Sequence, residues 1–184
     1  TSYCPDALKA ATLAASSAAR IKAFYDLDAP VTLKSIKSGI AVPYIGERGL
    51  SDFDIVLSYT GGRALAELKT VLGAKRVEPL YGSVDPAAHG LVPPLDAYAA
   101  DLSYLGTYAE DRQDALLKYF VEPSEMLPHK KFIIGGSLYP EAFPWTKNIF
   151  YARHVPPPAH PSFYCSSPFT LNVTRAAMSE MGYC

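Results

Sequence analysis

Residues 53–73 read FDIVLSYTGGRALAELKTVLG, and this stretch decides the fold. The apolar run Phe53–Tyr59 is typical of a strand, and the glycine pair Gly61-Gly62 then turns the chain. The segment Arg63–Leu72 follows as a predicted helix, because its apolar side chains fall on one face: Leu65, Leu68 and Leu72. A strand, a glycine turn and an amphipathic helix in this order form half of a βαβ unit and predict a parallel sheet.

The same alternation of short apolar runs and amphipathic stretches continues on both sides of this segment. Further strands are predicted at Ile21–Leu27, Arg76–Tyr81, Asp101–Leu105, Lys131–Ile134, Ile149–His154 and Phe169–Val173. Further helices are predicted at Ala7–Ala19, Thr32–Ser38, Arg112–Val121 and Pro161–Cys165. Strands that alternate with helices predict an α/β fold, in which ligands bind at the carboxyl ends of the strands.

A change of composition divides the chain in two. Residues 82–98 have no hydrophobic periodicity and are rich in turn formers: Gly82, Pro86, Gly90, Pro93 and Pro94. Such a composition is typical of a linker. We therefore expect two small Rossmann-like domains, at residues 1–84 and 99–184, joined by a linker at 85–98.

The composition excludes several functional classes. The chain has 184 residues with 17 basic and 18 acidic side chains, so we expect neither a nucleic-acid partner nor a membrane surface. The three cysteines, Cys4, Cys165 and Cys184, are too far apart for a disulfide framework or a zinc site. No apolar run is long enough for a membrane helix, and no signal peptide is recognisable. The expected location is the cytoplasm.

The segment Phe24–Thr32 ends a strand with the pattern Asp26-Leu27-Asp28, which places two carboxylates on one face of the chain. Three interpretations stay open. The two carboxylates could hold Mg²⁺ in a phosphohydrolase of the HAD type, although the later acidic motif of that class is not visible. They could instead cap the following helix, or face a substrate without a metal.

Other candidate residues lie where predicted strands end. Gly61 and Gly62 allow a ligand to approach a helix N-terminus, although a tight turn is the favoured interpretation. Gly106 and Arg112 follow the strand Asp101–Leu105, and an arginine there can bind a phosphate. His154 and Arg175 follow the last two strands and have the same two interpretations, an anion site or ordinary surface residues.

Several segments together resemble the CgeB-like family of GT-B glycosyltransferases. They are Tyr3–Asp6, Phe24–Thr32, Asp54–Gly62, Leu80–Pro86, Asp101–Gln113 and Phe163–Tyr183, and they span nearly the whole chain. The most specific of them are LSYTGG at 57–62, YGSVDP at 81–86 and LNVTR at 171–175. The resemblance implies a bacterial glycosyltransferase with two facing Rossmann-like domains. The nucleotide-sugar donor would lie on the C-terminal domain and the acceptor on the N-terminal domain.

The resemblance also implies which residues form the site. Those expected to contact the donor or its phosphates are Gly106, Thr107, Tyr108, Arg112, His154 and Arg175, with Tyr164 beside the base or ribose. Those expected on the acceptor side are Asp26, Asp28, Gly61 and Gly62. No catalytic residue is assigned, and neither a metal nor another cofactor is expected. The acceptor, whether a glycan, a protein or a small molecule, is left open.

The family places a further segment, with a glutamate that contacts the donor, beyond the position of Cys184. The sequence also starts with Thr1 and has no strand before its first predicted helix. We therefore expect a central fragment with two incomplete domains that is catalytically incomplete by itself. A non-catalytic protein that binds nucleotide sugars, or a scaffold protein, is the second hypothesis, and the HAD-like phosphohydrolase with Asp26 and Asp28 is the third.

Overall fold

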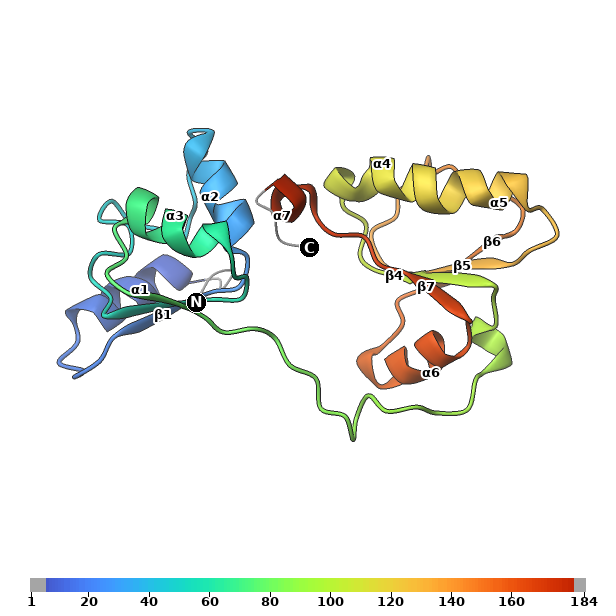
Figure 1. Cartoon of the computed structure of the whole chain (residues 1–184), viewed down its shortest axis with the longest axis horizontal. Coiled ribbons are helices and arrows are strands. Elements are labelled where there is room, and N and C mark those ends of the chain that lie inside the picture. Colours follow the sequence, from blue (N-terminus) through green and yellow to red (C-terminus); the bar gives the residue numbers. More distant parts are fainter. Residues whose placement is uncertain (1–5, 181–184) are drawn as a thin grey trace. The chain divides into compact units, whose positions relative to one another are not determined.

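The computed structural model describes residues 6–180, which divide into two compact units, each built on a parallel sheet (Figure 1). The first unit comprises residues 6–83 and the last helix, α7 (Ala176–Glu180), and the second comprises residues 84–175. The two parallel sheets confirm the predicted α/β fold class. Cys4, Cys184 and the family-like segments at residues 1–5 and 181–184 lie outside the described residues.

The first unit contains three parallel strands in the order β1-β2-β3. The strands are β1 (Ala23–Asp26), β2 (Ile55–Ser58) and β3 (Val77–Pro79), and the helices are α1 (Ala7–Ser16), α2 (Ala29–Lys37) and α3 (Arg63–Leu72). Buried residues alternate with less buried ones along β1 and β2, as a sheet with one fully covered face requires. Phe24 and Val56 on the covered face share a hydrophobic core with residues of all three helices, such as Leu33 and Leu68.

The second unit contains four parallel strands in the order β6-β5-β4-β7. Their bounds are β4 (Leu102–Leu105), β5 (Phe132–Gly136), β6 (Ile149–Arg153) and β7 (Phe169–Leu171). From β4 the chain adds two strands on one side and then returns to add β7 on the other. This order is that of a Rossmann half, and the reversal between β4 and β7 is its topological switch point.

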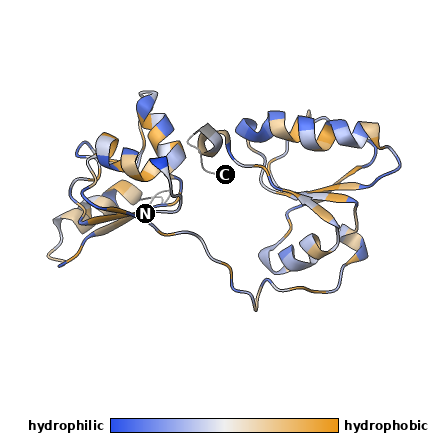
Figure 2. Cartoon of the chain, viewed as in Figure 1, coloured by the Kyte–Doolittle hydropathy of each residue, from blue (hydrophilic) through white to orange (hydrophobic). Residues whose placement is uncertain are grey.

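Helices cover both faces of the second sheet, as Figure 1 shows. On one face Tyr104 packs against Leu116 and Phe120 of the long helical segment at residues 110–126. On the other face Leu105 packs with Phe163 of α6 (His160–Cys165). Figure 2 shows hydrophobic and hydrophilic residues alternating along α3 and the α4–α5 segment, as expected for helices with one buried face.

The helical segment after β4 extends beyond the predicted end at Val121. Its parts are a 3-10 turn η2 (Glu110–Arg112), α4 (Gln113–Leu116), a π-helical turn η3 (Leu117–Val121) and α5 (Glu122–Met126). Proline has no N–H and its ring crowds the preceding turn of a helix. The wider π-turn directly before Pro123 accommodates that ring, so the helix continues to Met126.

A compact aromatic loop, residues 137–148, joins β5 to β6 where a helix is the usual connection. Tyr139, Phe143 and Trp145 pack on one another and on Tyr151 of β6, with ring centroids 4.4–5.8 Å apart. Asn148 closes the loop, because three carbonyl oxygens of residues 124–130 lie within 3.2 Å of its Nδ2. The aromatic cluster thus supplies the buried surface that a crossover helix otherwise provides.

The division of the chain differs from the expected one at its C-terminal end. Helix α7 groups with the first unit because Ala177 is buried and α7 contacts α2. The expected linker is largely exposed. It contains a turn in which the N–H groups of Ala88 and His89 donate to the carbonyl oxygen of Asp85, and a 3-10 turn at η1 (Asp96–Tyr98). Cys165 is a free thiol. None of the helices within residues 6–180 is long and apolar enough to cross a membrane.

Candidate functional site

A pocket of about 290 Å³ lies at the carboxyl ends of the strands of the second sheet. The loops that follow β4, β5 and β6 form it together with α6. Its lining residues are Leu105, Gly106, Thr107, Gly136, Ser137, His154, Val155, His160 and Tyr164. Parallel strands carry their functional loops at this edge, so the pocket lies where an open α/β sheet binds a ligand.

Glycines bring the first two loops of this pocket into backbone contact. Gly136 has a φ of 143°, and a Cβ at this position would overlap the carbonyl oxygen of Gly106. At Gly135 a Cβ would lie within 2.9 Å of side-chain atoms of both Phe163 and Val155. A side chain at position 136 would overlap backbone, so glycine there allows the loops after β4 and β5 to lie in contact.

The polar side chains of the pocket are two hydroxyl-bearing residues, a tyrosine and two histidines. The hydroxyl oxygens of Thr107 and Ser137 lie 3.5 Å apart. His160 donates from Nε2 to the carbonyl oxygen of Val155 at 3.1 Å, which leaves Nδ1 as its second hydrogen-bonding atom. Burial, and next the nearby Tyr104, raises the pKa of the Tyr164 hydroxyl, which stays a neutral donor. Within the described part of the chain, no Lys, Arg, Asp or Glu lines this pocket.

His154 has an unusual backbone at the end of β6. Its φ is 58°, in the left-handed region that residues other than glycine seldom adopt. The backbone N–H of His154 donates to the carbonyl oxygen of Gly136 at 2.7 Å, and this bond fixes the turn. The conformation directs the chain from β6 into the loop that lines the pocket and then into α6.

Two arginines lie in the loops on either side of the switch point. Arg112 donates from Nη1 to the hydroxyl oxygen of Tyr104 at 3.3 Å, and that hydroxyl lies directly beside Gly106. Arg175 donates from Nε to Oδ2 of Asp111 at 3.1 Å. Arg112 therefore lies beside Gly106 and Arg175 beside η2, and both lie outside the lining of the pocket.

The pocket brings together three of the six residues expected on the donor side: Gly106, Thr107 and His154. Tyr108 packs edge-to-face on Tyr139, on the face of the sheet that the long helical segment covers. Tyr164 also lines the pocket. The other five lining residues were not assigned a role from the sequence: Leu105, Gly136, Ser137, Val155 and His160. Gly136, Ser137 and Val155 lie in loops after predicted strands, where ligands are expected, whereas His160 does not.

The four residues expected on the acceptor side lie at the carboxyl edge of the first sheet. Asp26 is fully buried, and its Oδ1 accepts the backbone N–H of Asp28 at 3.0 Å, directly before α2. Gly62 has a φ of 64°, and Gly61 lies against the hydroxyl of Tyr81. Among residues 6–180, no three His, Cys, Asp or Glu side chains are grouped so that they could hold a metal ion.

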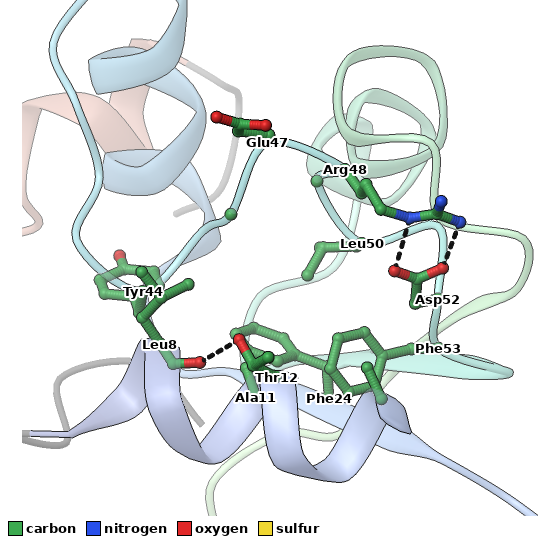
Figure 3. Close-up of a pocket in the computed structure, with 13 residues that line it drawn as sticks. Leu8, Ala11, Thr12, Phe24, Tyr44, Glu47, Arg48, Leu50, Asp52 and Phe53 are labelled. Atoms are coloured by element: carbon green, nitrogen blue, oxygen red, sulfur yellow. Dashed lines mark hydrogen bonds and ion pairs between the residues drawn. The ribbon is translucent and has the colours of Figure 1, made fainter. Parts of the chain in front are cut away.

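The first unit has its own pocket of about 280 Å³, between α1 and residues 44–53 (Figure 3). Phe24 and Phe53 form an apolar wall, with ring centroids 5.4 Å apart. At the rim Arg48 and Asp52 form a two-bond ion pair at 2.6 and 2.8 Å. No residue expected on the acceptor side lines this pocket, and the two rim charges satisfy each other, so we place the candidate site in the second unit.

Part of the chain is similar to a known protein family. Residues 112–183 are similar to a family described as glycosyl transferase-like. The similarity begins in η2, contains β5, β6, α6 and β7, and includes the lining residues from Gly136 to Tyr164. Gly106 and Thr107 lie just before it. No curated protein matches the chain.

Proposed function

We propose that this chain is part of a GT-B glycosyltransferase of the CgeB-like group and that its second unit binds a nucleotide-sugar donor. One observation carries the proposal. The pocket at the carboxyl ends of β4, β5 and β6 lies beside the β4–β7 switch point, and most of its lining falls within the residues similar to glycosyl transferase-like domains. Such a position is where open α/β sheets bind nucleotides.

The chemistry of the site divides in the way that a nucleotide sugar requires. The hydroxyls of Thr107 and Ser137 and the imidazole of His160 suit the uncharged nucleoside or sugar, which hydrogen bonds must orient. The diphosphate needs positive charge, and Arg112 and Arg175 supply it in the loops after β4 and β7. Gly106 lies between these two parts and permits close approach to its backbone.

In the proposed reaction an acceptor hydroxyl attacks the anomeric carbon of the donor sugar. The bond from that carbon to the diphosphate oxygen breaks, the leaving diphosphate takes the electron pair, and the proton of the acceptor hydroxyl is released to solvent. Arg112 and Arg175 offset the charge that develops on it, which lowers the barrier. The acceptor side comprises Asp26, Asp28, Gly61 and Gly62 of the first unit. The proposal assigns no general base and leaves open the acceptor and the stereochemistry.

A thermal-shift experiment tests this proposal. The chain is heated with UDP, GDP or dTDP and with their common sugars, with and without Mg²⁺. We expect one nucleoside diphosphate to raise the melting temperature whether or not Mg²⁺ is present. A ligand at a hundredfold excess over its Kd stabilises the folded state by about 2.7 kcal/mol.

Two variants make the result specific. His160→Ala removes an imidazole from the pocket and is expected to abolish most of the shift. Thr12→Ala changes the other pocket, in the first unit, and is expected to leave the shift intact. The proposal is wrong if no nucleotide shifts the melting temperature, or if His160→Ala leaves the shift unchanged.

A further inference from the structure

An ion pair spans the topological switch point of the second unit. Asp111 belongs to η2, after β4, and Arg175 follows β7, so the two residues are 64 positions apart in sequence. Arg175 Nε and Asp111 Oδ2 lie 3.1 Å apart, and about one third of each side chain is exposed (35% and 29%). The pair therefore joins the two loops between which a Rossmann sheet opens for its ligand.

Asp111 binds the guanidinium group of Arg175, which could also bind a phosphate. Carboxylates and phosphates both accept charge-assisted hydrogen bonds from the planar fork of arginine. The neighbouring Arg112 reaches the Tyr104 hydroxyl, which lies beside Gly106 at the edge of the pocket. A diphosphate that extended from the pocket past Gly106 would thus meet Arg175 with Asp111 already bound to it.

We propose that Asp111 is an internal counter-ion that competes with the donor diphosphate for Arg175. The inference rests on the proposed function, which places a nucleoside diphosphate in this unit. On binding, a phosphate oxygen replaces the Asp111 carboxylate on Arg175, and Asp111 returns to Arg175 as the nucleoside diphosphate leaves. Asp111 thereby weakens the binding of donor and product and speeds product release, a step that often limits turnover.

The test is isothermal titration calorimetry of the chain with UDP, GDP, dTDP and inorganic pyrophosphate. Asp111→Asn keeps the shape of the side chain and removes its charge. A partly exposed ion pair is worth roughly 1 kcal/mol, so we expect Asp111→Asn to bind pyrophosphate and the matching nucleotide about threefold to tenfold more tightly. Asp111→Glu, which keeps the charge, is expected to bind as the unaltered chain does.

Glu110→Gln is the matched control. Glu110 is the adjacent acidic residue, it is exposed, and within the described residues no ion pair of its side chain is found. This substitution changes the net charge equally but leaves the Asp111–Arg175 pair in place. An equal gain in affinity in Glu110→Gln and Asp111→Asn would show a general effect of charge and would overturn the proposal.

A double-mutant cycle tests whether Asp111 acts through Arg175. Arg175→Gln is expected to weaken binding, and Asp111→Asn is expected to add nothing in that background. The counter-ion proposal is overturned if Asp111→Asn still raises the affinity when Arg175 is replaced by Gln. It is also overturned if Asp111→Asn alone does not raise the affinity. Melting temperatures of all variants show whether each one is folded.

The outcomes also separate the inference from the proposed function. If one nucleotide binds the unaltered chain and Asp111→Asn with equal affinity, the proposed donor site is supported and the proposed role of Asp111 as a counter-ion is wrong. If no nucleotide binds but pyrophosphate binds Asp111→Asn more tightly through Arg175, the counter-ion stands and the donor proposal is wrong. If neither ligand binds any variant, both are wrong.

Discussion

The hydroxyl of Tyr139 donates a 3.1 Å hydrogen bond to the carbonyl oxygen of Gly106. This bond joins the aromatic loop after β5 to the glycine loop after β4, at the edge of the candidate site. Burial, and next the nearby Tyr104, raises the pKa of the Tyr139 hydroxyl, so the donor stays protonated. The aromatic cluster therefore supports the pocket as well as the fold, because it holds the Gly106 loop in place.

Removing this one hydroxyl should loosen the loop. Tyr139→Phe keeps the ring in its cluster but leaves the Gly106 carbonyl without that donor. We expect a loss of about 1 kcal/mol in the free energy of unfolding, measured in urea, and weaker nucleotide binding. Tyr119→Phe, at an exposed position of the helical segment, is the control and should change neither quantity. Equal stability of both variants would show that the bond does not support the loop.

The loss of stability at alkaline pH gives an independent test of the burial of the Tyr139 hydroxyl. The pKa of Tyr139 is higher in the folded chain than in the unfolded chain, whose tyrosines titrate near pH 10. Its contribution to stability is therefore complete below about pH 10 and is lost as the pH rises toward the folded pKa. Unfolding curves above pH 10 should show a steeper loss of stability for the unaltered chain than for Tyr139→Phe. Parallel curves for the two would contradict the raised pKa.

Asn148 should be the most sensitive polar residue of the aromatic loop. Its amide nitrogen lies 3.0, 3.2 and 2.9 Å from the carbonyl oxygens of Ser124, Leu127 and Lys130, near the end of α5. Asn148→Ala removes these bonds and should cost roughly 1–3 kcal/mol of unfolding free energy. Asn148→Asp should cost more, because it places a negative charge against carbonyl oxygens.

Lys147→Ala, at the exposed position next to Asn148, is the control. The melting temperature of all three variants is measured by circular dichroism. A melting temperature of Asn148→Ala equal to that of Lys147→Ala would mean that the loop does not depend on this side chain.

Gly136 should tolerate no side chain. Its φ of 143° is strained for any other residue, and a Cβ there overlaps the Gly106 oxygen. We expect Gly136→Ala to lower the unfolding free energy by about 3 kcal/mol and to prevent nucleotide binding. In Gly46→Ala of the first unit, the new Cβ makes an ordinary 3.5 Å contact with Leu8, so this control should stay stable. If Gly136→Ala bound the nucleotide with the affinity of the unaltered chain, the contact between Gly136 and Gly106 would not be needed for the site.

Most of the fold could be predicted from the sequence, because the strands and helices repeat a simple periodicity. The helix Arg63–Leu72 was predicted to the residue. Helix α7 was missed, because it is short and its burial depends on a contact with α2 that no local pattern signals. The aromatic loop was missed for a similar reason, since its regularity lies in ring packing and not in spacing.

The candidate site could be predicted only in part. Gly106, Thr107 and His154 come directly after strands, and parallel strands carry their ends to one edge. Tyr108 and Arg112 were expected beside them but do not line the pocket, and they contact Tyr139 and Tyr104 instead. Sequence spacing gives no direction for side chains in an irregular loop. No local sequence pattern marks His160 as a site residue, because only the turn at His154 brings the start of α6 to the pocket.

An NMR titration of the ¹⁵N-labelled chain with UDP, GDP and dTDP shows directly whether the second unit holds a donor site. We expect saturable shifts for one nucleotide at the amides of the pocket: Gly106, Thr107, Gly136, Ser137, His154, His160 and Tyr164. We also expect a response at the side-chain Nε–H of Arg175. Shifts concentrated instead at Phe24, Arg48 and Phe53 of the first unit, or no shifts with any of the three nucleotides, would contradict a donor site in the second unit.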